Sequence, residues 1–181
     1  EGATAIGPRA FAGSSVSSIV LPSTLKYIGS YAFNRTGISS IILPDSLTYI
    51  GEGVFEKCNS LVSLTIPVNV EGINNNPVLD CAFLTTISVA GGNANYKAVD
   101  GVLYSYDGSR IVAVLAAKTG NFDIPASVTV IGSCAFCGCE SLDCINIPVE
   151  VNEFEWNVFT DCSENIMVVF VHLLGTNRIV H

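Results

Sequence analysis

The sequence predicts a solenoid of about six stacked coils, because one pattern recurs at a nearly constant spacing. Residues 25–29, an Ala-Phe pair and the run 38–44 are followed 22 or 23 positions later by residues 47–51, a Val-Phe pair and the run 61–67. Proline closes the recurring run at positions 22, 44, 67, 125 and 148. A period of 20 to 50 residues is typical of units that bury their apolar face only by stacking on copies of themselves.

Length and composition agree with one domain, residues 1–181. The chain is 49% hydrophobic and only 13% charged, and a domain of this size buries about 70% of the surface of its unfolded chain. The net charge of −8 argues against a nucleic-acid partner, which would require a basic face. The longest apolar run, 167–174, is too short to span a membrane. The first residues lie inside a repeat, so we expect a piece of a longer protein with further coils upstream.

Each coil is expected to contain three parts. The first is an extended Leu-x-x-Ile turn, the second a short helical or 3₁₀ arc around Ala-Phe, and the third a strand that ends at Pro. Alternate strand residues face opposite ways, so Ile41 and Leu43 point inward. Proline lacks a donor N–H and belongs at the end of the strand. The glycines at 7, 29, 51 and 132 are expected where a Cβ would crowd the backbone.

The period breaks after the fourth coil. Coils are predicted over residues 1–89 and 123–170, with an insertion at 90–122 and a cap at 171–181. Two runs rich in β-forming residues, 101–106 and 110–115, flank Asp107-Gly108-Ser109, which is a hairpin turn signal. We therefore predict a β-hairpin that replaces the outer arc of one coil and still continues the stack.

The repeat Leu-x-x-Ile-x-Ile-Pro-x-x-Val/Leu-x-x-Ile-Gly-x-x-Ala-Phe-x-x-Cys resembles the BspA-like, or Treponema-type, leucine-rich repeat, and the insertion at 100–104 resembles a hairpin that interrupts many such proteins. The resemblance implies a leucine-rich-repeat solenoid, α/β or mainly β. It also implies a cell-surface or secreted protein of gut or oral bacteria, or of a mucosal protist. Members of the family are associated with adhesion to host proteins and cells. Membership of such a family predicts the architecture of a protein far better than it predicts the ligand.

Four of the seven cysteines share one repeat position, three residues after the Phe. Small side chains occupy this position throughout: Ser14, Thr36, Cys58, Cys81, Cys139 and Cys162. Free cysteine behaves as a small buried hydrophobe, so we predict a structural ladder of buried, unpaired thiols whose donors meet carbonyl groups of the neighbouring coil. Disulfides between adjacent rungs have the right Cα spacing, but parallel Cβ vectors would strain them.

The remaining cysteines lie in one coil, at positions 134, 137 and 144. Cys134-x-x-Cys137 permits a zinc or redox interpretation. A structural role is favoured, because the sequence has no second such pair and its two histidines, His172 and His181, are distant. We expect no metal ligands, no cofactor and no catalytic residues, hence no enzyme. Turn chemistry accounts for Asp100-Gly101 and Asp107-Gly108 better than a calcium loop.

A protein-binding or adhesion module is the favoured function, and an architectural spacer of a longer surface protein is the alternative. The predicted contact surface, here called the strand face, is the concave set of uncharged outward strand positions: Ser18, Val20, Ser40, Ile42, Ser63, Thr65, Thr86, Ser88 and Asn146. Val168 and Phe170 join this set if the last strand slips by one residue, as Ile166 suggests. Tyr104 and Tyr106 are predicted rim anchors, and the expected partner is a protein such as a host matrix or cell-surface protein. Small and β-branched residues also suit stacked strands without any partner. Glu150, Glu153 and Glu155 with Trp156 are interpreted as a solvated arc rather than an acidic patch with an anchor.

Overall fold

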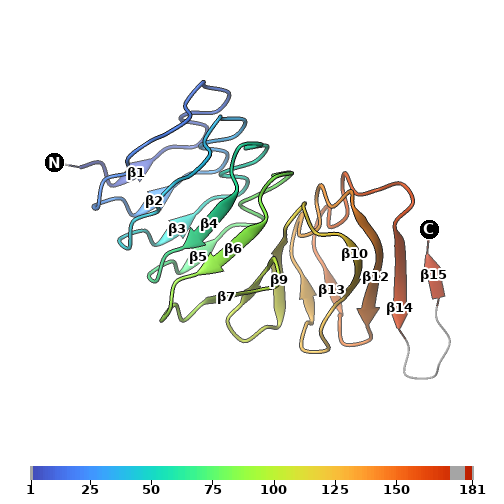
Figure 1. Ribbon diagram of the computed structural model, residues 1–181. Helices are drawn as coiled ribbons and strands as arrows, with labels where there is room; N and C mark the ends of the chain where they lie inside the picture. Colours follow the sequence, from blue (N-terminus) through green and yellow to red (C-terminus); the bar gives the residue numbers. More distant parts are fainter. Residues whose placement is uncertain (1, 172–177, 181) are drawn as a thin grey trace.

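The computed structural model of the protein describes residues 2–171 and 178–180. It is a β-solenoid in which successive coils stack from the N-terminus toward the C-terminus (Figure 1). The predicted leucine-rich-repeat solenoid is therefore confirmed. Across these described residues the regular elements are all strands, and none of them forms a helix long and apolar enough to cross a membrane.

One series of short strands immediately precedes the Gly of each coil, or its counterpart. In the first half it comprises β1 (Ala5–Ile6), β2 (Tyr27–Ile28), β3 (Tyr49–Ile50) and β5 (Gly72–Ile73). These pair in parallel in the order β1-β2-β3-β5. The sequence predicted only an extended turn here. Two residues per coil are too few for a periodic strand signal, and the sheet arises because neighbouring coils stack in register.

A second series lies at the recurrent prolines or at their counterparts in the repeat. It comprises β4 (Ser63–Ile66) and β6 (Thr86–Val89) in one sheet, and β10 (Gly120–Asp123), β12 (Leu142–Pro148) and β14 (Met167–Val171) in another. All neighbours in this series pair in parallel, and β15 (Arg178–Val180) pairs antiparallel with β14. The expected strands at 16–21 and 38–43 do not form, since these segments have no ladder pairing.

The arcs are tight turns, so the expectation of helical or 3₁₀ arcs was wrong. Alternate N–H groups bond to the next coil instead of their own: Phe33 donates to the carbonyl of Val54 at 2.9 Å. The flanking residues Tyr31 and Arg35 adopt left-handed φ values of 60° and 56°, which interrupt any helix. The Phe rings then stack coil on coil, with 5.7 Å between the centroids of Phe33 and Phe55.

The insertion forms the predicted hairpin together with a third strand. Strands β7 (Tyr96–Val99), β8 (Val102–Ser105) and β9 (Arg110–Val114) pair antiparallel in that order. Strand β9 also pairs in parallel with β11 (Val130–Ile131), which pairs with β13 (Glu153–Phe154), so the stack continues through the insertion. The sequence missed β7 because its alternation is weak.

The hairpin separates two hydrophobic cores and is buried on both faces. Leu103 and Ala113 pack in the first core, whereas Val102 and Val114 pack in the second. Because the insertion supplies no outer arc, the arcs of the flanking coils meet directly. Asn76, in a degenerate coil, donates a hydrogen bond from Nδ2 to the Cys134 carbonyl oxygen at 3.0 Å across this junction.

Candidate functional site

The structure brings part of the predicted strand face together as one uncharged surface. Ser63 pairs with Thr86 and Thr65 with Ser88, while the intervening Leu64 is buried. The hydroxyl oxygens of Thr65 and Ser88 lie 2.9 Å apart and share a hydrogen bond. Hydroxyl side chains therefore form a continuous polar strip on β4 and β6, with Ser88 half-buried.

The strand face becomes apolar in the first two coils. The side chains of Val20 and Ile42 are 95% and 87% exposed, although β-branched aliphatic residues usually bury such surface. They line a groove of about 350 Å³ together with Ser18, Ile19, Leu21, Ser23, Ser40, Ile41 and Pro44. No backbone hydrogen bond joins segment 16–21 to segment 38–43 within the described residues. The groove thus combines apolar side chains with unpaired peptide groups.

Beyond the hairpin the strand face is neither uncharged nor fully open. Asn146 is half-buried and its Nδ2 donates to Asp123 Oδ1 at 2.6 Å, which brings a carboxylate into the surface. The sequence-based prediction omitted Asp123, which the register of β10 places beside Asn146. Val168 and Phe170, expected on this face, instead pair with Ile145 and Ile147 and pack inward. The expected one-residue slip of the last strand does not occur.

Only one of the two predicted aromatic anchors is exposed. Tyr106 is 59% exposed at the end of the hairpin, but Tyr104 is buried in the second core and is not a rim anchor. A register shift in the pairing of β8 with β9 falls between Leu103 and Tyr104. Both faces of the hairpin are covered, so alternation along its sequence does not separate inside from outside.

The residues of the predicted ladder form side-chain bonds to the preceding coil. Cys58 Sγ donates to the Phe33 carbonyl oxygen at 3.0 Å, and Cys81 Sγ donates to that of Phe55 at 2.9 Å. Thr36 Oγ1 lies 3.4 Å from Cys58 Sγ. All seven cysteines fall in the described residues, and all are free thiols. Burial raises the pKa of the Cys81 thiol to about 12, so the thiol stays protonated and donates.

The insertion interrupts this arrangement. Cys139 Sγ points to the hairpin carbonyl oxygens of Val114 and Leu115 at 3.9 and 3.8 Å, because no regular arc precedes it. Cys162 is partly exposed and donates to the Phe136 carbonyl oxygen at 3.2 Å. At the N-terminal end, Ser14 Oγ is the one buried side-chain oxygen or nitrogen in the described part that lacks a hydrogen-bond partner. Cys58, Cys81 and Cys162 donate to the preceding coil, whereas Thr36 Oγ1 donates to the Phe33 carbonyl oxygen of its own coil at 2.9 Å.

The other cysteines have structural surroundings. Cys137 Sγ donates to the Asn157 carbonyl oxygen at 3.1 Å, and burial is the main cause that raises the pKa of both Cys134 and Cys137. Cys144 is buried on β12. No group of three or more His, Cys, Asp or Glu side chains among the described residues is arranged to hold a metal ion. His172 and His181 lie outside the described residues.

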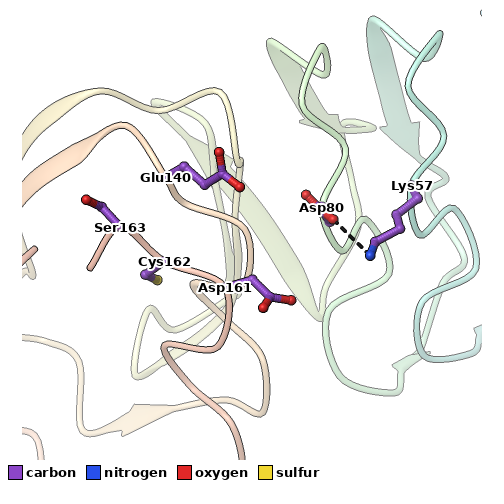
Figure 2. A pocket seen from close by; sticks show the side chains of 6 residues that line it. All are labelled: Lys57, Asp80, Glu140, Asp161, Cys162 and Ser163. Carbon is purple, nitrogen blue, oxygen red and sulfur yellow. Dashed lines mark ion pairs between the residues drawn. The ribbon is translucent and has the colours of Figure 1, made fainter. Parts of the chain in front are cut away.

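An acidic hollow of about 580 Å³ lies where the arcs of the two halves meet. Figure 2 shows Lys57 and Asp80 on one side, facing Asp161 across the hollow. Its lining is Lys57, Asp80, Glu140, Asp161, Cys162 and Ser163. Lys57 Nζ lies 3.3 Å from Asp80 Oδ2, so one of the three carboxylates is already paired. The remaining two carboxylates do not form a metal-binding group with other described side chains.

A half-buried ion pair that the sequence did not predict connects the hairpin to the last coil. The two terminal guanidinium nitrogens of Arg110, Nη1 and Nη2, donate to Glu155 Oε1 and Oε2 at 2.6 and 2.7 Å. Glu155 Oε2 also accepts from Ser133 N and Oγ at 2.9 and 3.0 Å. The bond from Arg110 is the main cause that lowers the pKa of Glu155 to about 2. Its sequence signal was Glu in a position that holds Gly in four other coils.

Comparison with solved structures shows the same architecture. A leucine-rich repeat protein from Eubacterium ventriosum superposes with a TM-score of 0.79 at 26% identity, over 94% of this chain and 52% of that one. The pneumococcal vaccine antigen PcpA gives 0.70 at 22% identity over 88% and 48%. A leucine rich cell surface protein from Faecalibacterium prausnitzii gives 0.68 at 23% identity over 93% and 51%. The chain thus spans about half the length of these structures.

No curated protein matches the chain at a significant level. The repeats themselves are diagnostic. Residues 1–98 and 116–172 match the BspA type Leucine rich repeat region in six copies, and the unmatched stretch between them contains the hairpin. The chain therefore belongs to the BspA-type leucine-rich-repeat family.

Proposed function

We propose that this chain is a non-enzymatic protein-binding module of a cell-surface or secreted protein, and that it acts in adhesion. The observation that carries the proposal is the exposure of Val20 and Ile42 side by side on an uncharged strand face. Exposed apolar side chains that line a common groove are typical of surfaces that bind other proteins. Two similar structures, a vaccine antigen and a cell surface protein by name, support the proposed location.

The partner is a protein such as a host matrix or cell-surface protein, and its contact segment is flat or extended. The groove offers aliphatic side chains from two coils and unpaired peptide groups between them. Extended segments use main-chain hydrogen bonds for affinity and side-chain pockets for specificity. The hydroxyl strip on β4 and β6 continues this surface toward Ser63 and Thr86. The strand face before the hairpin is therefore the proposed contact.

The test places lysine at three exposed strand-face positions together, Ser40→Lys, Ser63→Lys and Thr86→Lys. Their side chains point away from the core, so the variant is expected to fold and to lose binding to immobilised host matrix proteins. The matched control carries the same added charge at exposed positions elsewhere, as Asn59→Lys, Ser60→Lys and Ala82→Lys. Binding that survives in the folded strand-face variant would favour the architectural spacer instead.

A further inference from the structure

The last coil carries a second hollow, separate from the strand face, that has the chemistry of a cation receptor. The hollow measures about 600 Å³ and is lined by Ser133, Glu153, Phe154, Glu155 and Trp156. Trp156 is 84% exposed and Phe154 is 41% exposed. Trp156 occupies the position after the Gly counterpart, where preceding coils carry Ser30, Glu52 and Ser133. A large aromatic side chain thus replaces a small or polar one on the surface.

The charges around this hollow leave one carboxylate available. Glu155 uses both oxygens on Arg110 and Ser133, so the positive charge of Arg110 is compensated. Glu153 is exposed on β13, and no ion pair involves it within the described residues. The walls therefore present an exposed indole, a phenyl ring and an uncompensated negative charge.

We propose that this hollow binds an arginine side chain presented by a partner protein. A guanidinium group stacks on an aromatic face and also pairs with a carboxylate through its planar fork of donors. Charge complementarity favours a cation, since the chain carries a net charge of −8 and Glu153 lies at the rim. The hollow is distinct from the strand face, because its acidic residue lies on the sheet of β9, β11 and β13.

The chain contains one tryptophan, so its intrinsic fluorescence reports directly on this hollow. A blocked tetrapeptide with a central arginine is expected to change Trp156 emission in a saturable way. The same peptide with citrulline, whose side chain is planar but neutral, is expected to bind with an affinity at least about fivefold lower. Glu153→Gln is expected to lower the affinity for the arginine peptide to a similar degree. Added sodium chloride is also expected to lower this affinity.

Three controls test whether the fluorescence response arises from arginine bound in this hollow. Phe83→Ala removes an exposed aromatic ring from the other half of the stack and is expected to leave the titration unchanged. The lysine triple variant of the strand face is expected to bind the arginine peptide normally. A failure of the arginine-binding proposal is therefore distinguishable from a failure of the proposed function. Trp156→Ala, followed by titration calorimetry, is expected to lose binding while remaining folded.

Any of three results would overturn the proposal. The first is equal binding of the citrulline peptide. The second is a response of Trp156 to an oligosaccharide but not to arginine, which would identify a sugar platform. The third is the absence of saturation by the arginine peptide up to about 10 mM, because a dissociation constant above that concentration is too weak for specific binding of an arginine side chain.

Discussion

The Cys81 thiol donates a hydrogen bond to the carbonyl oxygen of Phe55, 2.9 Å away in the preceding coil. Cys81 is fully buried, so Cys81→Ala removes this bond and leaves a small cavity. We expect a loss of about 1–2 kcal/mol in the free energy of unfolding. Cys81→Ser keeps a donor in the same place and is expected to lose less. Urea denaturation measures both, and an alanine variant as stable as the parent would contradict the role of the bond.

Burial of the ladder thiols predicts low reactivity in the folded protein. The pKa is raised to about 12 for Cys81 and Cys139 and to about 11 for Cys162, mainly by desolvation. At pH 8 a thiol with a pKa of 12 is ionised in roughly one molecule in ten thousand, and the thiolate is the reactive form. A thiol reagent should therefore label these residues slowly in native protein and fast in urea. Fast native labelling of Cys81 would be inconsistent with this burial.

The same shifts predict a decline of stability at alkaline pH. The folded pKa of Cys81 exceeds the ordinary thiol value of 9.0, so the unfolded chain loses its protons first. The stabilisation is fully present below pH 9 and is lost as the pH rises through about 12 for Cys81. Urea midpoints measured between pH 8 and pH 11 should fall, and the fall should be smaller in Cys81→Ser. A variant with an unchanged slope would show that this thiol does not contribute.

The Arg110–Glu155 pair predicts acid sensitivity. The pKa of Glu155 is lowered from 4.5 to about 2, so its stabilisation is present above pH 4.5 and is lost as the pH falls toward 2. Glu155→Gln should lower the free energy of unfolding by about 1–3 kcal/mol at pH 6, since the charge-assisted bonds are lost. Glu153→Gln, which removes an exposed carboxylate, is the control and should change stability little. Equal effects of the two substitutions at pH 6 would argue against the pair.

Two glycines at the same repeat position should respond differently to alanine. A Cβ on Gly51 would lie 2.4 Å from Ser30 N, a backbone atom of the preceding coil, whereas a Cβ on Gly7 would meet nothing within 4 Å. Gly51→Ala should therefore cost at least about 2 kcal/mol, because the coils must separate, while Gly7→Ala should be neutral. Thermal unfolding of the two variants tests the difference. Comparable losses would mean that local backbone conformation, and not coil spacing, selects glycine here.

The candidate sites were only partly predictable from the sequence. Ser63, Thr65 and Thr86 were placed on an exposed strand face because strand alternation and the terminal Pro define inside and outside. Tyr104 and Asp123 were misplaced or missed, because their environment depends on which strand lies beside them. The Arg110–Glu155 contact joins residues 45 positions apart, and no local pattern encodes such a distance.

Periodicity by itself determined the solenoid, the inward positions and the glycines at coil contacts, because each coil must present its apolar residues to the next at equal intervals. The tertiary structure decided the remaining features. The arcs became turns rather than helices because alternate N–H groups bond to the adjacent coil, as Phe33 does to Val54. The hairpin became a partition between two cores because neighbouring coils cover both of its faces. These outcomes depend on contacts between coils. A repeat pattern predicts how neighbouring coils align, but it does not predict which segment packs against an irregular coil or an insertion.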